Sequence, residues 1–591
     1  MKNNKILITV LLLSTLILPM GSCRKVLDLA PVSAFDEKYV FSNSQSATSA
    51  IYGVYRALAA VYANGVIGLW SIDTDEFIGD VSNPGSLDNF HRYSTTPQNS
   101  AMALTFTPLW QGIERANIII KNVPAMELYK SGSATDKAQL KRVYGEALAL
   151  RAYFYLDLIR YWGDVPFPLE PSIDQPNLSL PKVDRDIIYD RIIEDLRVAA
   201  ELMPWRGDSG VNNDERLTKG SVKGIRALAA ITAGGYSLRK ASRQMERRKD
   251  YLKMYQIARD EAYELMQRRD KHRLNPDYRA VFKDANMVSK IEPNGEVLFE
   301  VADGERGNAR FSNKNGPRAA IDNNSFNFGS GAIRGLPTYF YAFDPLDTRR
   351  DVTLCSYYIN RDRTIAVQRM LNMTDGKYRI DWKEPYPTTS DAYQGVNWYL
   401  LRLSDVILIF AEAENELKNG PTPEAKSAFE EVRKRGFKGN ETNIGLTPGT
   451  KEAFFQAIVD ERRFELGGEG IRKPDLIRWN LLGTTLIKTR AELTKMRANE
   501  APYNLLPRTM WYKTGEREPK YANSFYLATP SGVPPAGYLA IGWLQDISPT
   551  PQYANYNLNL GRDFKPNKSE LFPIPQGALD GNPNLTQDYG Y

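Results

Sequence analysis

Cysteine and histidine are nearly absent from this chain of 591 residues. Only Cys23, Cys355, His91 and His272 occur. A structural zinc site needs several such ligands at short spacing, and a histidine-based catalytic triad needs a histidine within a recognisable motif. Phosphate loops of the G-x-x-x-x-G-K-[ST] type, and G-x-G-x-x-G motifs that open a helix, are also missing. We therefore expect neither a metal nor a cofactor.

A strong charge of one sign is missing as well. The chain has 76 basic and 70 acidic residues, which gives a formal net charge of +6 at pH 7. Proteins that bind nucleic acids concentrate basic residues on one face or along one helix. This small excess of basic residues does not indicate a nucleic-acid partner. Hydrophobic residues make up 42% of the chain, which is enough for a sizeable core.

The start of the chain reads as a targeting segment. Residues 1–22 contain two lysines and then the apolar run Ile6–Leu18, which is too short to span a bilayer permanently. Small residues precede Cys23, as in a bacterial lipoprotein signal, so we expect Cys23 to carry lipid and residues 23–36 to form a tether. An ordinary secretory peptide with an incidental cysteine is the alternative. If Cys23 carries lipid, Cys355 has no disulfide partner in the chain. We then expect Cys355 to be a buried free thiol.

The clearest helix lies in YGEALALRAYFYLDLIRYWGDVP, residues 144–166. Its apolar residues recur at steps of three and four and cover nearly the whole circumference, so the helix should be buried between other helices. Gly163 provides a C-terminal stop, and Pro166 prevents continuation. We expect this segment to be the central helix of a helical domain.

Other segments show the same helical period at lengths near twenty residues, with short connections between them. They are 42–62, 101–123, 184–203, 218–238, 251–268, 396–417, 423–435 and 451–466. Such lengths and connections indicate stacked helix pairs resembling tetratricopeptide repeats, although the strict repeat consensus is absent. The predicted fold class is therefore mainly α, with tetratricopeptide-like pairs.

Residues 275–395 have a different character. Helical period is lost, glycine and asparagine are frequent, and aromatic residues alternate with polar ones. Only 296–301 alternates as a short strand would. Exposed rings on loops carried by a rigid scaffold would make a binding surface. The alternative is that most of these rings pack the loops onto the helices.

These observations divide the chain into parts of one composite domain. In order they are the signal peptide 1–22, the tether 23–36, an N-terminal helical part 37–274, the irregular aromatic part 275–395, a C-terminal helical part 396–480, and an irregular strap 481–591.

Four ordered blocks resemble the SusD/RagB family of nutrient-binding outer-membrane lipoproteins. They are RAYFYLDLIRYWGDVP (151–166), YLLRLSDVILIFAEAENEL (399–417), ERRFELGGEGIRKPDLIRW (461–479) and LFPIPQGALDGNPNLTQDYGY (571–591). The chain departs from the family pattern at Gly467-Gly468, where larger residues are usual, and at Lys473-Pro474, where an aromatic pair is usual.

The resemblance implies a role. Such proteins are lids over a SusC-like TonB-dependent transporter in the outer membrane, anchored by lipid and facing the cell surface. They capture a nutrient, usually a glycan and in some members a peptide, and deliver it to the channel. The helices are expected on the transporter side and the irregular part on the ligand side. No catalysis is implied.

A sugar site needs aromatic rings for the apolar face of a pyranose and planar polar groups for its hydroxyls. By residue type, the candidates are Trp70, Asp73, Asn89, Arg92, Tyr341, Trp382 and Tyr386. Asp73 belongs to the acidic stretch WSIDTDEF, residues 70–77. That stretch could bind sugar hydroxyls or a cation such as calcium, and the alternative is a solvated acidic turn.

Two other classes of function are considered. A glycoside hydrolase would need two carboxylates about 5–10 Å apart. Glu465 and Glu469 are the pair considered for a general acid and base. The many neighbouring arginines should hold both acids ionised, which disfavours an acid/base couple. A helical scaffold that binds only proteins would leave the aromatic part 275–395 without a purpose.

Overall fold

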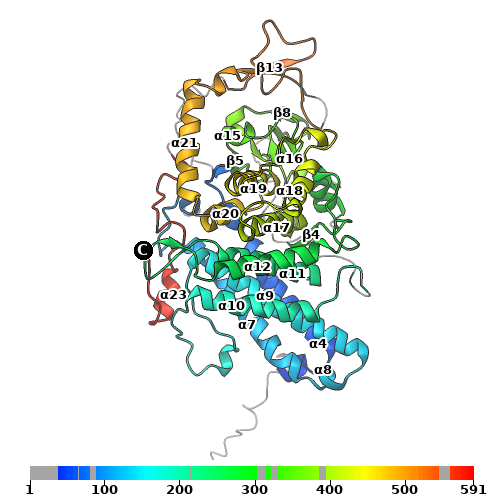
Figure 1. The fold of residues 1–591 in the computed structure, drawn as a ribbon, viewed down its shortest axis with the longest axis vertical. Helices are drawn as coiled ribbons and strands as arrows, with labels where there is room; N and C mark the ends of the chain where they lie inside the picture. The colour runs from blue at the N-terminus through cyan, green and yellow to red at the C-terminus, as the bar shows by residue number, and fades with distance from the viewer. Residues whose placement is uncertain are drawn as a thin grey trace, which may run out of the picture.

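The computed structural model describes residues 37–63, 66–79, 88–208, 211, 216–289, 291–302, 314–320, 329–384, 395–514, 517–544 and 559–591. Within them, helices form the lower half of the molecule, and a second group of helices with short strands forms the upper half (Figure 1). The predicted signal peptide, tether and lipidation site Cys23 lie outside the described residues.

The long helices stack in the order of the chain. Each one packs against the next, from α4 through to α12, and α12 then packs against α17, which also contacts α18 and α19. They are α4 (Ser44–Ala63), α7 (Ala103–Asn122), α9 (Ala134–Trp162), α10 (Arg185–Leu202), α11 (Lys219–Gly234), α12 (Tyr251–Met266), α17 (Leu403–Leu417), α18 (Pro423–Gly436) and α19 (Lys451–Leu466). The predicted mainly helical fold is confirmed.

Further helices connect or cap this stack. The short ones are α3 (Glu37–Val40), α5 (Val66–Trp70), α6 (Asp88–His91), α8 (Glu127–Ser131), α13 (Tyr278–Ala280), α15 (Pro337–Phe340), α16 (Arg349–Thr353), α20 (Arg472–Arg478) and α23 (Gln576–Gly581), and α21 (Leu482–Ala498) is a long one. None of the helices in the described ranges is long and apolar enough to cross a membrane.

The α9 helix is the centre of the lower half, as its sequence predicts. Every residue from Gly145 to Ile159 is buried. The polar residues among them are satisfied by neighbouring helices; for example, Arg151 donates to Asp195 on α10 at 2.6 Å. Other predicted helix starts also hold, since the Asp184 side chain accepts from the backbone N–H of Asp186 at the start of α10.

One predicted helix begins with a strand. Residues 396–417 were expected to be helical throughout, but β10 (Trp398–Arg402) precedes α17. It pairs antiparallel with β4 (Val297–Val301), which the alternation at 296–301 predicted. Both strands are buried on both faces, so they carry continuous apolar residues, and a short apolar run of this kind fits helix and strand patterns equally well.

The region 481–591 is more ordered than the predicted irregular strap. It contains the α21 helix and a three-stranded antiparallel sheet of β12 (Lys520–Tyr521), β11 (Thr509–Lys513) and β13 (Leu539–Gly542). Buried residues such as Leu486 and Leu493 lie on α21 among threonines and lysines, so the helix has little apolar stripe. The α21 helix and β13 form the top of the molecule in Figure 1.

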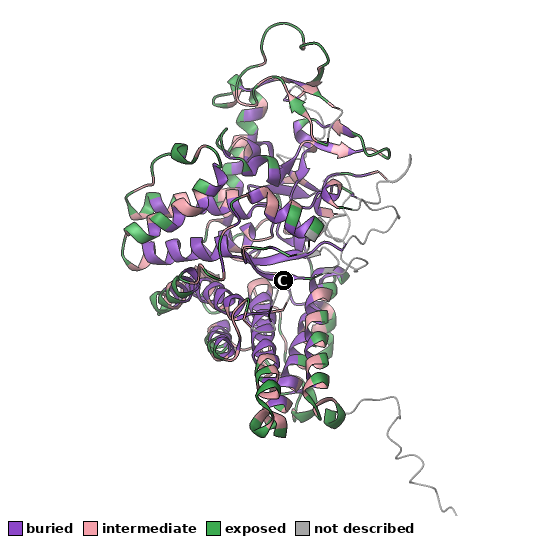
Figure 2. Ribbon diagram, turned by 90° about the vertical axis from the view of Figure 1, so that its right-hand side faces the viewer, coloured by how far each residue is buried: buried purple, intermediate pink, exposed green. Residues whose placement is uncertain are grey.

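The aromatic part 275–395 holds a second core. A four-stranded antiparallel sheet in the order β1 (Phe77–Gly79), β5 (Ile333–Gly335), β9 (Thr374–Asp375) and β6 (Leu354–Cys355) lies beside the hairpin of β7 (Tyr357–Ile359) and β8 (Ile365–Val367). Many rings here are buried, including Tyr339, Phe340 and Phe343, and buried segments run through the interior of the upper half as well as through the helices (Figure 2). This supports the alternative that the rings pack the loops onto the scaffold.

The remaining cysteine also lies in this part. Cys355 is fully buried and free, and burial raises the pKa of its thiol to about 12. The expectation of a buried thiol is confirmed.

Replacing Gly163 tests the predicted stop of α9. Gly163 has φ +75°, and a Cβ there would lie 2.4 Å from Nη2 of Arg185, which is held by Asp164 at 2.8 Å. Gly163→Ala should therefore lower the unfolding free energy by about 2 kcal/mol, measured as a reduced melting temperature. Gly577→Ala, where a Cβ meets open space, is the control. Equal melting temperatures for the two variants would contradict this account.

Candidate ligand-binding cleft

Trp70 was expected to face a sugar, but the structure places it in the core. The side chain is fully buried at the end of α5. Its ring centroid lies 4.8 Å from that of Phe572 and 5.1 Å from those of Phe90 and Tyr161. Protein rings therefore occupy the positions where a pyranose would stack. The helical period of the sequence cannot reveal that Trp70 is buried, because the rings that cover it come from distant segments of the chain.

The acidic stretch after Trp70 is neither a solvated turn nor an open site. The Asp73 side chain is buried, bonds to Nδ1 of His91 at 3.0 Å, and accepts from the backbone N–H of Gly79. Asp75 is held by Arg472 at 2.7 Å and by Arg463 at 3.1 Å. These carboxylates fix the turn between α5 and β1. In the described part of the chain no group of His, Cys, Asp and Glu side chains is arranged to hold a metal ion.

The surroundings of Asp75 and Glu76 shift the pKa values of these two carboxyl groups in opposite directions. Burial raises the pKa of Asp75, but Arg463 and Arg472 outweigh it and lower that pKa below its ordinary value. Burial dominates at Glu76, whose pKa rises to about 8. Among the described residues, Oε1 of Glu76 has no hydrogen-bond partner. Glu76 is therefore a protonated acid at neutral pH.

The other predicted contacts are dispersed. Asn89 is half-buried on α6 and accepts from the Ser94 hydroxyl at 3.4 Å, and Arg92 is buried just after that helix. Tyr341 is half-buried, and its hydroxyl accepts from Nε1 of Trp543 at 3.0 Å. Tyr386 lies outside the described residues.

Trp382 is also covered rather than exposed. Its side chain is 4% exposed, and the guanidinium groups of Arg279 and Arg379 lie 5.3 Å and 4.7 Å from its ring centroid. Ligand contact by the seven candidates stays a prediction. At the buried residues it would require neighbouring side chains to move.

Arg279, which covers the Trp382 ring, also lines a polar cleft. The cleft has a volume of about 390 Å³ and is formed by α13, the segment 345–352 with α16, the end of α18, and residue 518 before β12. Its charged lining residues are Asp277, Arg279, Asp347, Arg350, Asp351, Lys438 and Glu518. Opposite charges alternate around the opening.

The pairs at the rim are accessible to solvent. Lys438 donates to Asp277 at 2.8 Å, and both side chains are about half exposed. Arg279 forms a two-point pair with Glu518. Exposed pairs of this kind contribute about 0–1 kcal/mol to stability, so a ligand hydroxyl can replace one partner at little cost. The cleft can therefore exchange internal ion pairs for hydrogen bonds to a polar ligand.

Sequence reasoning missed this cleft because its residues come from four distant segments. One signal was present: the stretch DPLDTRRD, residues 344–351, concentrates charge inside the aromatic part. Arg350 from this stretch lies 4.8 Å from the ring centroid of Phe340 and 5.4 Å from that of Tyr526. These aromatic residues thus pack against a charged residue of the cleft.

A second hollow is larger and apolar. It has a volume of about 570 Å³ and lies between α7, the connector 166–180 and α23, in the lower half of Figure 1. Trp110, Leu178 and Leu585 are among its lining residues. An apolar groove of this kind suits a protein segment, whereas a glycan requires polar partners.

Glu465 and Glu469 do not form an acid/base couple. Both are buried and bonded to Arg402, at 2.8 Å and 2.7 Å. Burial raises the pKa of Glu465, but the charges of Arg435, Arg402 and Arg349 outweigh it and lower that pKa. The pKa of Glu469 is also lowered, by Arg402 and Lys377. The expectation that basic neighbours hold both acids ionised is confirmed.

Comparison with known proteins matches this architecture to one family. Residues 368–591 match the family described as "SusD family", and residues 27–224 match the one described as "Starch-binding associating with outer membrane". SusD-like protein P25 of Formosa agariphila is 24% identical over 536 residues, which cover 83% of this chain and 93% of that protein. The chain belongs to the SusD-like family.

Solved structures share the fold. A SusD homolog from Bacteroides thetaiotaomicron has a TM-score of 0.74 at 24% identity, covering 94% of this chain and 98% of that one. Surface glycan-binding protein A from the same species, solved in complex with laminarihexaose, has a TM-score of 0.62 at 16% identity, covering 92% and 99%.

Removing the Glu76 charge should change how stability depends on pH. The folded state holds the Glu76 proton up to about pH 8, whereas the ordinary pKa is 4.5. Between these values the unfolded state binds fewer protons, so the group destabilises the fold as pH rises. Glu76→Gln should therefore gain stability relative to the wild type from pH 4.5 to 8, measured by urea unfolding. A difference that stays constant over this range would contradict the assignment.

Proposed function

We propose that the protein captures a glycan in the polar cleft formed by Asp277, Arg279, Asp351, Lys438 and Glu518. The observation that carries the proposal is this cleft of about 390 Å³, rimmed by exchangeable ion pairs, in a member of the SusD-like family. Carboxylates accept from sugar hydroxyls, and guanidinium and ammonium groups donate to them. Capture of a peptide is the alternative for the same cleft.

The comparisons support a sugar ligand. One structural neighbour is named a laminarin-binding SusD-like protein, and another was solved with laminarihexaose. The buried, paired state of Glu465 and Glu469 supports capture without hydrolysis. The protein then acts as a binding protein and not as an enzyme.

Delivery to a membrane transporter completes the proposed role. The chain would be anchored to the outer membrane by lipid on Cys23, facing the cell surface, and would pass the glycan to a SusC-like TonB-dependent transporter. The family description "associating with outer membrane" supports this location. The apolar groove on α7 and α23 lies in the half of the molecule away from the polar cleft (Figure 1), so a transporter docked there leaves the cleft open.

The cleft is tested by calorimetric titration of the chain from Arg24 onward with a panel of polysaccharides, oligosaccharides and peptides. Arg279→Gln should weaken glycan binding about tenfold, since a charged hydrogen bond contributes about 1.5 kcal/mol. The control is Arg268→Gln, which removes a pair with Asp270 of similar exposure on the helical half. Unchanged affinity in Arg279→Gln would place the ligand elsewhere. Heat with peptides alone would favour the alternative ligand.

The transporter face is tested separately. Trp110→Arg puts a charge into the apolar groove and should abolish co-purification with the transporter from outer membranes, while glycan affinity stays at the wild-type value. Leu446→Arg, at a fully exposed leucine, is the control and should retain the complex. Retention of the complex by Trp110→Arg would exclude this groove as the contact.

A further inference from the structure

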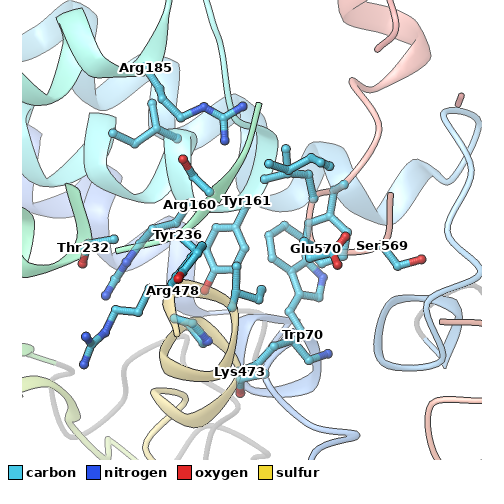
Figure 3. A pocket seen from close by; sticks show the side chains of 18 of the residues that line it. Trp70, Arg160, Tyr161, Arg185, Thr232, Tyr236, Lys473, Arg478, Ser569 and Glu570 are labelled. Atoms are coloured by element: carbon cyan, nitrogen blue, oxygen red, sulfur yellow. The ribbon is translucent and has the colours of Figure 1, made fainter. Parts of the chain in front are cut away.

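A small cavity lies where the end of α9, the α20 helix and the strap segment Ser569–Phe572 meet (Figure 3). Its volume is about 60 Å³. Trp70 and Tyr93 complete the wall. The proposed capture of a glycan makes no use of this cavity.

Lys473 is the unusual group in the wall. Its side chain is buried, the residue being 6% exposed, and within the described part of the chain its Nζ has no hydrogen-bond partner. Nζ lies 4.2 Å from the ring centroid of Tyr93. A ring face compensates only part of the cost of burying an ammonium group.

The other cations in the wall are paired. Arg185 donates to Asp164 at 2.8 Å, Arg478 to Glu412 at 2.5 Å, and Arg160 lies 3.7 Å from Asp157. Among the described residues, Lys473 forms no ion pair with a carboxylate. Burial lowers the pKa of Lys473 to about 7, and the charge of Asp73 opposes this shift. The cavity wall thus contains one buried amine whose protonated form would gain from a nearby anion.

Two further polar atoms in the wall are unsatisfied. Within the described residues, Nε1 of Trp70 and Oε2 of Glu570 have no hydrogen-bond partner. Burial raises the pKa of Glu570. The charge that acts on Lys473 is that of Asp73 and not that of Glu570. The indole N–H of Trp70 and the amine of Lys473 therefore favour a small ligand that accepts hydrogen bonds and carries negative charge.

We propose that this cavity binds a small monovalent anion, of the size of acetate or bromide, against the ammonium group of Lys473. The volume admits only a few non-hydrogen atoms, since a single water needs about 10–15 Å³ on the same scale. A sugar ring is too large. The ligand would add a charged contact where α9, α20 and the strap segment meet.

Crystals of the chain from Arg24 onward, soaked in sodium bromide, test the site directly. We expect an anomalous peak beside Nζ of Lys473, and its loss when acetate replaces most of the bromide. Displacement by acetate shows that a carboxylate is accepted, and a peak that acetate leaves unchanged shows that the site takes halide only. A cavity that holds water alone under both conditions would overturn the proposal.

Melting temperature gives a second readout that does not depend on glycan binding. At constant ionic strength, acetate in several-fold excess over its Kd should raise the melting temperature by about 1–2 °C relative to a bulky anion. Lys473→Met keeps the length of the side chain and should lose this shift. Lys121→Met, at an exposed lysine, should keep it. The same shift in Lys473→Met as in the wild type would overturn the proposal.

Discussion

The buried pairing of Arg402 with Glu465 and Glu469 holds the strand β10 against the end of α19. Arg402 ends β10, and the two acids lie at and just beyond the end of α19, so the guanidinium group joins the strand to the helical hairpin. Arg435 of α18 also reaches Glu465, and both it and Arg402 bond to Glu296 beside β4. Removing one partner from such a buried group costs about 3–5 kcal/mol, because an uncompensated charge remains.

The same network positions the cleft. Arg349 is fully buried and bonds to Glu461 of α19 at 2.6 Å and to Asp347 at 2.7 Å. The next residue, Arg350, lines the cleft together with Asp351. The ion pairs at the rim can therefore be replaced by contacts to a ligand without loosening the fold. The backbone beneath them is held by the ion pairs of Arg349, which are buried away from water. Rigid support beneath adaptable contacts limits the entropy lost on binding.

Local patterns predicted the helices well and the site poorly. The period of 144–166 identified α9, and cap residues such as Asp184 located helix ends within a residue or two. These signals act over three or four residues. The burial of Trp70 depends on Phe572, and the cleft depends on the meeting of Arg279 with Glu518, contacts that span hundreds of residues. A single sequence carries no local pattern for such contacts.

The difference between the cleft and the cavity follows from dielectric environment. At the cleft rim, the Asp277–Lys438 pair is half exposed, so water and a sugar hydroxyl compete with it on nearly equal terms. At Lys473, burial removes water as a competitor, and the ammonium group gains far more from one anion than an exposed lysine would. The two proposed sites therefore differ in the ligand that each would favour: the half-exposed polar cleft would suit a large neutral ligand, and the small cavity at Lys473 would suit a single charge.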